Sequence, residues 1–270
     1  MIRGTTQLVA IIGSPIAQVK SPENFNAWFD AAGADLAMVP MDVRAGELDA
    51  CLALLRGWQN LRGCVVTVPY KQAFATRVDA LSRRAAALGA VNVVRREADG
   101  RLVADMVDGL GFLGAAQAHG FAPAGARAVV VGAGGVGSAI AYALCEAGVG
   151  SLALLDVDAG RQARLAAVLR NGFPEVDLQL ECASLAGVDL LVNATPVGMG
   201  DTGALPLDPA LLQTLGATAH VADVVTSPVV TPLLELARTR GCTVQTGPEM
   251  AKAQLGHLGV AMGVMPESHA

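Results

Sequence analysis

The sequence predicts an α/β protein with an N-terminal α/β domain followed by a domain built on a doubly wound parallel sheet. Short β-branched runs alternate with alanine- and leucine-rich segments of roughly 10 to 15 residues, which is typical of βαβ units. Hydrophobic residues make up 53% of the chain and charged residues 16%, so a large core can be buried. At 270 residues the chain exceeds one small core, and we expect two domains.

The expected strands are short and rich in Val, Ile and Leu: Leu8–Ile12, Ala37–Asp42, Gly63–Val68, Ala128–Val131, Leu152–Asp156, Leu190–Asn193, His220–Val225 and Thr243–Gln245. The expected helices lie between or after them: Glu23–Ala32, Glu47–Trp58, Lys71–Asp79, Ser82–Leu88, Gly109–His119, Val136–Ala147, Ala159–Arg170, Pro232–Arg240 and Glu249–Met262. Around Phe121–Gly125 a helix ends and a new strand begins, which marks a candidate boundary.

Composition argues against several classes of protein. The net charge of −5 disfavours a nucleic-acid surface, and no apolar run has the character of a membrane span. The first residues lack the features of a secretion signal. Five scattered cysteines without a CxxC pair suggest free thiols rather than disulfides or a metal site. We therefore expect a cytoplasmic protein without a metal.

A glycine-rich turn, Gly132-Ala133-Gly134-Gly135-Val136-Gly137, follows the strand Arg127–Val131 and opens an apolar helix. In this context the pattern predicts a dinucleotide-binding turn of the Rossmann type. Gly132 permits the tight turn, Gly134 lets the backbone approach the pyrophosphate, and Gly137 lets the helix pack closely on the strand. The N-terminus of the helix offers N–H groups to the phosphates. The alternative is a turn without a ligand.

Asp156 ends the next strand, 19 residues after Gly137. A carboxylate there accepts hydrogen bonds from the adenosine ribose and repels a 2′-phosphate, and no arginine follows before Arg161. The sequence therefore predicts NAD as the cofactor, with NADP disfavoured. The alternative for Asp156 is a capping role at the end of the strand.

The segment Val65–Lys71 ends a strand at a proline and places Lys71 at the start of a helix. An amine at a sheet edge suits proton transfer, although a solvated lysine is the simpler interpretation of these residues alone. The four histidines lie outside any motif and are interpreted as solvent or packing residues: His119, His220, His257 and His269.

Together these motifs make the chain resemble the shikimate/quinate dehydrogenase family along nearly its whole length. The matching segments follow one another at compatible spacings: Gly13–Ile16, Ser21-Pro22, Asn26, Thr67–Lys71, Leu88–Asn92, Asp108–Phe112, Gly132–Gly137, Asn193–Met199, Asp223–Val225, Pro228, Thr231–Leu234, Gly247, Met250 and Gln254.

The resemblance implies roles for individual residues. Lys71 would be the proton acceptor and Asp108 the carboxylate that orients it. The implied substrate contacts are Ser21, which would bind a carboxylate, and Thr67, Asn92 and Gln254. The implied contacts with the nucleotide and nicotinamide are Thr195, Val224 and Gly247. Alternatively, Asn92 caps the loop after Gly89 and Gln254 is a surface residue.

The implied organisation is a substrate-binding and catalytic domain of residues 1–107, to which a C-terminal helix, 248–270, returns. Residues 108–247 would form the NAD-binding Rossmann-type domain. We expect a monomer or homodimer that binds a hydroxylated ring acid and neither nucleic acid nor membrane.

Six positions depart from the family pattern, all around the expected substrate pocket: Val19, Phe25, Val65, Met106, Val107 and Thr226. Val19 replaces a carboxylate-binding serine and Thr226 a tyrosine, while the other four replace His, Asn, Asn and Thr in that order. Each lost charge-assisted hydrogen bond is worth roughly 1.5–3 kcal/mol. Two losses around one carboxylate would weaken its recognition by roughly two to four orders of magnitude unless Lys20 or Gln18 compensates.

The sequence thus predicts NAD-dependent oxidation of a ring secondary alcohol, either shikimate or quinate or a diverged analogue with altered carboxylate recognition. Two alternatives remain. One is an NADP-preferring shikimate dehydrogenase, and the other is a non-catalytic dinucleotide sensor on the same scaffold. Retention of both Lys71 and Asp108 disfavours the sensor, because a sensor needs neither.

Overall fold

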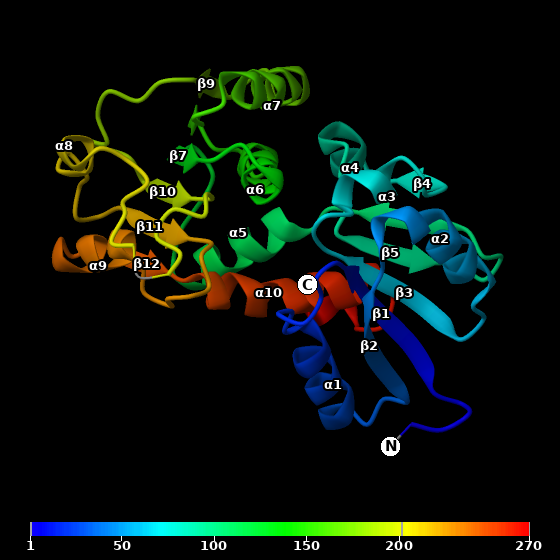
Figure 1. The fold of residues 1–270 in the computed structure, drawn as a ribbon. Helices are drawn as coiled ribbons and strands as arrows, with labels where there is room; N and C mark the ends of the chain where they lie inside the picture. The colour runs from blue at the N-terminus through cyan, green and yellow to red at the C-terminus, as the bar shows by residue number, and fades with distance from the viewer. Residues whose placement is uncertain (1, 201, 270) are drawn as a thin grey trace. The chain divides into compact units, whose positions relative to one another are not determined.

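The computed structural model describes residues 2–200 and 202–269 of this α/β protein, which confirms the predicted fold class (Figure 1). The described residues divide into two compact units. The first runs to Val107 and includes the residues from Leu255 onward, and the second runs from Asp108 to Gln254. The loop Phe121–Gly125 lies inside the second unit.

The first unit contains a six-stranded sheet in the order β2-β1-β3-β5-β6-β4. Its strands are β1 (Gln7–Gly13), β2 (Leu36–Asp42), β3 (Leu61–Val66), β4 (Ala80–Leu81), β5 (Val93–Arg96) and β6 (Leu102–Asp105). Its helices are α1 (Ser21–Ala31), η1 (Ala45–Glu47), α2 (Leu48–Gly57), α3 (Lys71–Ala75), α4 (Arg83–Leu88) and η2 (Glu267–His269). Phe25 and Phe29 of α1 are fully buried and fix this helix to the unit's core.

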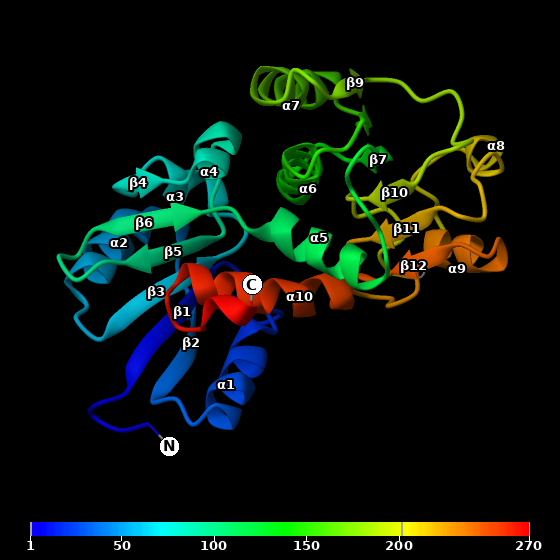
Figure 2. The same ribbon diagram turned by 180° about the vertical axis from the view of Figure 1, so that it is seen from behind.

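The sheet of the first unit is mixed because β5 runs antiparallel to both β3 and β6. The βαβ alternation did not predict this hairpin, whose strands lie side by side in Figure 2. Both strands have four residues and β5 ends in two arginines, which weakens the hydrophobic pattern. Arg96 nevertheless suits the strand, because its guanidinium donates to the carbonyls of Leu55 and Arg56 at 2.8–3.1 Å.

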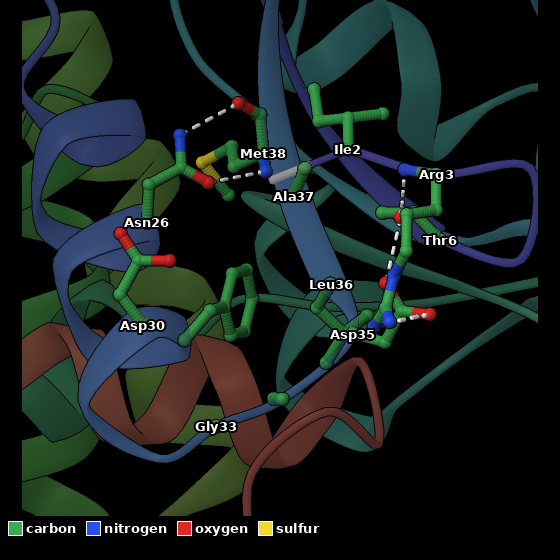
Figure 3. A pocket seen from close by; sticks show the side chains of 12 residues that line it. Ile2, Arg3, Thr6, Asn26, Asp30, Gly33, Asp35, Leu36, Ala37 and Met38 are labelled. Carbon is green, nitrogen blue, oxygen red and sulfur yellow. Dashed lines mark hydrogen bonds and ion pairs between the residues drawn. The ribbon is translucent and has the colours of Figure 1, made fainter.

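The outer edge of β2 is closed by one side chain of α1. The Nδ2 of Asn26 donates to the Met38 carbonyl at 3.0 Å, and its Oδ1 accepts from the Met38 N–H at 2.7 Å (Figure 3). Pro40, two residues further along the same edge, has no N–H to donate. The amide and the proline together satisfy or remove the groups that a further strand would need.

The second unit contains a six-stranded sheet in the order β12-β11-β10-β7-β8-β9, and its strand pairs are all parallel. Its strands are β7 (Arg127–Val131), β8 (Ser151–Leu155), β9 (Asp177–Gln179), β10 (Leu190–Asn193), β11 (His220–Asp223) and β12 (Thr243–Gln245). Its helices are α5 (Asp108–Ala118), α6 (Gly135–Glu146), α7 (Ala159–Gly172), α8 (Pro209–Leu212) and α9 (Pro232–Thr239).

This strand order is that of a doubly wound dinucleotide-binding sheet, with the order reversing between β7 and β10. In such sheets ligands bind beyond the carboxyl ends of the strands at the point of reversal. Leucine and valine side chains of β10 and β11 are fully buried, which explains why these strands read as continuous apolar runs. The last helix, α10 (Gly247–Ala261), contains the boundary between the units at Leu255.

Three predicted elements end at least two residues earlier than expected. β3 stops at Val66, and one further ladder bond, from the Thr67 N–H to the Ile12 carbonyl at 2.9 Å, leads into the turn at Pro69. α3 stops at Ala75, where the Thr76 hydroxyl donates to the Ala73 carbonyl at 3.1 Å. β11 stops at Asp223, whose side chain accepts from the backbone two residues later. Five further short elements were not predicted from the sequence: β4, β9, α8, η1 and η2.

In the part of the chain that is described, no helix is long and apolar enough to cross a membrane. All five cysteines are free thiols, and four of them are buried. Burial raises the pKa of the Cys145 thiol to about 12, with the Glu175 charge contributing in the same direction. These side chains therefore act as small packing residues.

Candidate functional site

The glycine turn lies at the carboxyl end of β7, at the reversal point of the second sheet. A Cβ on Gly137 would lie 1.8 Å from the Gly132 carbonyl oxygen, so α6 and the turn approach too closely for any side chain. Gly132 has a φ of +105°, and its Cβ would meet the Ala194 carbonyl at 2.9 Å. These two glycines are required by the backbone of the turn itself.

Gly134 and Gly135 differ from that pair because a Cβ on either would meet nothing within 4 Å among the described residues. Gly134 is the N-cap of α6 and provides no side-chain cap, so the first turn of the helix presents its N–H groups outward. An open glycine surface at an uncapped helix N-terminus is a suitable cradle for a pyrophosphate. The turn therefore fits the dinucleotide that its sequence predicts.

Asp156 follows β8 directly, and its side chain is only 5% exposed. Its Oδ2 accepts from the Ala133 N–H at 2.6 Å, while Oδ1 accepts from the Asp158 N–H at 2.8 Å and from Arg161 at 3.2 Å. Burial raises the pKa of this carboxyl, but the two backbone hydrogen bonds and the Arg161 charge outweigh burial and lower the pKa overall. The site thus holds a firmly ionised carboxylate that already pairs with the nearest arginine.

The predicted contacts with the nucleotide and nicotinamide follow the neighbouring strands of this sheet. Thr195 comes after β10, Val224 after β11, and Gly247 opens α10 after β12. A Cβ on Gly247 would lie 2.7 Å from the Val224 carbonyl oxygen, so these two turns pack directly on each other. A Cβ on Gly132 would lie 2.9 Å from Thr195 Cγ2, so the turn after β10 packs directly against the glycine turn.

In the first unit, Lys71, Thr67 and Asn92 gather at one edge of the sheet. Thr67 follows β3, and the Val66 N–H donates to the Asn92 carbonyl at 2.8 Å. The Lys71 carbonyl accepts from the Val91 N–H at 3.0 Å, so the start of α3 is tied to the segment before β5. Ser21 begins α1, in the connection that leaves the carboxyl end of β1. Lys71 is half-buried.

Asn92 is 2% exposed, and its Oδ1 accepts from the Val107 N–H at 2.8 Å. This contact fixes the backbone directly before Asp108.

Asp108 opens α5 in the second unit and is 3% exposed. Gln254 of α10 donates from Nε2 to the Asp108 carboxylate. The two helices approach closely there, because a Cβ on Gly111 would lie 2.7 Å from the Gln254 Cα. Gln254 is thus a partner of Asp108 rather than a free surface residue.

Four of the six departures from the family pattern are buried: Phe25, Val65, Met106 and Val107, each at most 6% exposed. Val19 is half-buried, and Thr226 is exposed in the loop after β11. The Val19 isopropyl group offers no hydrogen bond to a carboxylate, which leaves Lys20 and Ser21 as the polar side chains that follow it in this connection.

His119 and His220 of the second unit already have side-chain partners. His220 is 4% exposed and its Nε2 lies 3.1 Å from Gln245 Oε1, while His119 pairs with Glu249 at 3.0 Å. Burial lowers the pKa of His220, although the hydrogen bond to Gln245 opposes it. No cluster of His, Cys, Asp or Glu among the described residues has the geometry of a metal site.

A cavity of about 410 Å³ lies beside α1 and β2, with Arg3, Asn26 and Asp35 among its lining residues (Figure 3). Asp35 is already bonded to the hydroxyls of Thr5 and Thr6, at 2.7 and 2.6 Å, which fastens the N-terminal segment to the start of β2. None of the described residues predicted to act on substrate or cofactor lines this cavity. It is a structural feature of the N-terminal segment.

The sequence analysis assigned no role to two buried polar residues of the second unit, Asn193 and Asp223. They end adjacent strands, β10 and β11, with exposures of 0% and 2%. Polar residues at the carboxyl ends of neighbouring parallel strands are the signal that could have identified them from sequence.

Comparison with known proteins supports the geometry. Residues 11–94 match the family model described as the shikimate dehydrogenase substrate binding domain. A shikimate dehydrogenase (NADP(+)) of Moorella thermoacetica is 39% identical over 92% of this chain and 85% of its own length. The enzyme of the same name from Rhodospirillum rubrum is 39% identical over 99% of this chain and 95% of its own length.

Solved structures give the same fold. Shikimate 5-dehydrogenase of Listeria monocytogenes, in complex with shikimate and NAD, has a TM-score of 0.90 at 28% identity and covers 99% of this chain and 96% of its own. Quinate dehydrogenase of Corynebacterium glutamicum in complex with NAD has a TM-score of 0.84 at 32% identity. The match covers 95% of this chain and 93% of that enzyme. Ligand-free 5-ketofructose reductase of a Gluconobacter species has a TM-score of 0.88 at 28% identity. The match covers 98% of this chain and 96% of that enzyme.

Proposed function

This chain belongs to the shikimate dehydrogenase family, and from that premise we propose that it catalyses the NAD-linked interconversion of a secondary ring alcohol and its ketone. The predicted family is confirmed, and with it an oxidoreductase that acts on a CH–OH group. The observation that carries the proposal is the glycine turn at the reversal point of a doubly wound sheet, with an open surface at Gly134 and Gly135.

Lys71 and Asp108 are the proposed proton-transfer residues. When bound, a nicotinamide dinucleotide would supply the hydride acceptor for alcohol oxidation and the donor for ketone reduction. Lys71 Nζ would take the hydroxyl proton during oxidation and return it during reduction. Asp108 would hold that amine in place, and Gln254 supports the proposal because it fixes the Asp108 carboxylate by a hydrogen bond.

NAD is the proposed cofactor because of Asp156. Its ionised carboxylate stands where the ribose is expected, and it already pairs with Arg161, the cation that a 2′-phosphate would need. The curated relatives are named for NADP(+), whereas the solved Listeria and Corynebacterium enzymes contain NAD. The second candidate is therefore an NADP-preferring enzyme, and Arg161 is the residue that favours it.

The proposed substrate is a hydroxylated ring compound whose carboxylate is recognised more weakly than in a typical shikimate dehydrogenase. Val19 and Thr226 support this, because both lack the groups that the family resemblance assigns to carboxylate binding. Among the structural neighbours, one is in complex with the ring acid shikimate and another is named for a ketofructose, a keto sugar without a carboxylate.

Turnover rates with each of several substrates test the proposal. The rates with shikimate and quinate are compared with those for their methyl esters and for neutral ketohexoses, and every rate is measured once with NAD and once with NADP. We expect esters or neutral substrates to be used within about tenfold of the acids, with NAD preferred. Strong NAD-linked activity confined to shikimate would refute the weakened carboxylate recognition. No activity with any ring alcohol, combined with tight dinucleotide binding, would favour the sensor alternative.

A further inference from the structure

A buried hydrogen-bond cluster stands at the carboxyl ends of β10 and β11. Its three side chains are Asn193, Asp223 and Thr231, which are 0%, 2% and 1% exposed. They come from the end of β10, the end of β11 and the N-cap of α9. Buried polar groups in folded proteins are almost always hydrogen-bonded, so the partners of these three side chains show which segments the cluster fixes.

Asp223 is the centre of the cluster. Its carboxylate accepts from Asn193 Nδ2, 3.1 Å from each oxygen, and from the Thr231 hydroxyl at 2.7 Å. It also accepts from the Val225 N–H at 3.0 Å, which turns the chain out of β11 immediately after Val224. Burial raises the pKa of Asp223, while these three donors act in the opposite direction.

Asn193 extends the cluster into the turn after β10. Its Oδ1 accepts from the Thr195 N–H at 3.1 Å and from the Thr195 hydroxyl at 2.7 Å. Its Nδ2 also donates to the Val197 carbonyl at 2.9 Å. One amide therefore fixes both the backbone and the side chain of Thr195.

Thr231 closes the cluster from the far end of the β11 loop. Its hydroxyl donates to Asp223 and accepts from the Leu234 N–H at 3.4 Å, so it also caps α9. The loop between Val224 and Thr231 is thus held at both ends by the same carboxylate. This loop contains Thr226, the exposed departure from the family pattern.

We propose that Asn193, Asp223 and Thr231 are positioning residues that hold the nicotinamide side of the dinucleotide site. Their side chains bond Thr195 and Val225 directly, and the Asn193 carbonyl accepts from the Val224 N–H at 3.0 Å. The Val224 and Val225 carbonyls in turn pack against Gly247. The glycine turn and Asp156, which hold the adenosine and pyrophosphate side, are not bonded to the cluster by any hydrogen bond found between described residues. This inference rests on the proposed function, because it needs a dinucleotide at this site.

The test compares Thr231→Val, which keeps the shape of the side chain, with Thr231→Ser, which keeps the hydroxyl. Dissociation constants for NAD and for ADP are measured by calorimetry, together with the melting temperature. For Thr231→Val we expect weaker NAD binding by roughly 2- to 30-fold and unchanged ADP binding, because ADP does not reach the nicotinamide side. Thr231→Ser should restore NAD binding.

Asp208→Ala is the matched control, since Asp208 caps α8 in the same unit through a 2.7 Å hydrogen bond to the Ala210 N–H. It should lower the melting temperature without changing the NAD to ADP ratio. If Thr231→Val does not fold, Thr231→Ala, which leaves room for water in place of the hydroxyl, serves as the second variant with the same expected ratio.

Two failures are distinguishable. Equal losses of NAD and ADP binding, or no loss of either, would overturn the positioning role and leave the cluster purely structural. A wild-type chain that binds neither ligand would instead refute the proposed function.

Discussion

Replacing Asp156 by asparagine should change the preference between NAD and NADP. The substitution keeps the size of the side chain and one acceptor oxygen, but it removes a negative charge that is 5% exposed. It also frees Arg161, whose guanidinium lies 3.2 Å from Asp156 Oδ1. The variant therefore removes repulsion toward a 2′-phosphate and releases a cation for it.

The magnitude follows from simple electrostatics. Two unit charges about 6 Å apart interact by about 3 kcal/mol at an effective dielectric constant of about 20. Allowing for solvent, relief of about 2–3 kcal/mol corresponds to a gain of roughly 30- to 160-fold in kcat/KM with NADP. NAD should lose about 1 kcal/mol, or roughly fivefold, as a charged acceptor becomes a neutral one. The preference should thus shift by roughly two to three orders of magnitude.

The assay is the initial rate with each cofactor at a fixed ring-alcohol concentration, for the wild type and the variant. Asp158→Asn is the control, because this side chain is 52% exposed and keeps its N-cap oxygen for the Arg161 N–H. We expect it to change the ratio by less than about threefold. An Asp156→Asn variant with the wild-type ratio, or a wild type that prefers NADP, would refute the reasoning.

Three further predictions concern catalysis, the glycine turn and acid stability. Lys71→Ala should lower kcat by roughly 10²- to 10⁴-fold while NAD binding stays within twofold; unchanged turnover would exclude Lys71 as the base. Gly137→Ala should lower the melting temperature by several degrees, because its Cβ would lie 1.8 Å from the Gly132 carbonyl oxygen. Gly134→Ala should leave the melting temperature unchanged, because its Cβ would meet nothing within 4 Å, and should weaken NAD binding. Equal melting of the two alanine variants would contradict this difference. Hydrogen bonds from Arg84 and Ser82 and the Arg84 charge outweigh burial and hold the pKa of Asp105 below its ordinary value. The stabilisation is therefore fully present above the ordinary carboxyl pKa and is lost as the pH falls through the lowered pKa of the folded state. Melting followed from pH 6 to pH 2.5 should fall less steeply for Asp105→Asn, and identical acid limbs would show that another group controls them.

Much of the fold could be predicted from local sequence because hydrophobic periodicity and turn residues are local properties. The strands that flank the glycine turn and the helix after it occur where the pattern places them. The β5–β6 hairpin could not be predicted in this way, since the guanidinium of Arg96 in β5 is satisfied by carbonyls about 40 residues earlier in the chain. A hydrogen-bond partner at that sequence separation cannot be detected from the hydrophobic pattern of a short segment.

The same limit applies to the candidate site. The motifs predicted Lys71, Asp108 and the glycine turn as candidate site residues, because family motifs and forced glycines place characteristic residues at fixed spacings. Asn193 and Asp223 were quoted within motifs, yet their role depends on a 3.1 Å contact between two strands that are 30 positions apart. Gln254 was predicted to contact substrate, which stays a prediction, and its bond to Asp108, 146 positions away, could not be read from the sequence.

The sequence by itself therefore determined the family, the α/β class and the kind of chemistry, since each depends on residue types in a local order. The tertiary structure alone decided which polar groups are already bonded to one another. Asp156 illustrates the difference: its position after a strand predicted a ribose contact, but only the folded chain pairs its carboxylate with Arg161 and buries both oxygens against backbone N–H groups. Hydrogen bonds and burial depend on distances in space, and a linear pattern does not contain those distances until the sheet has formed.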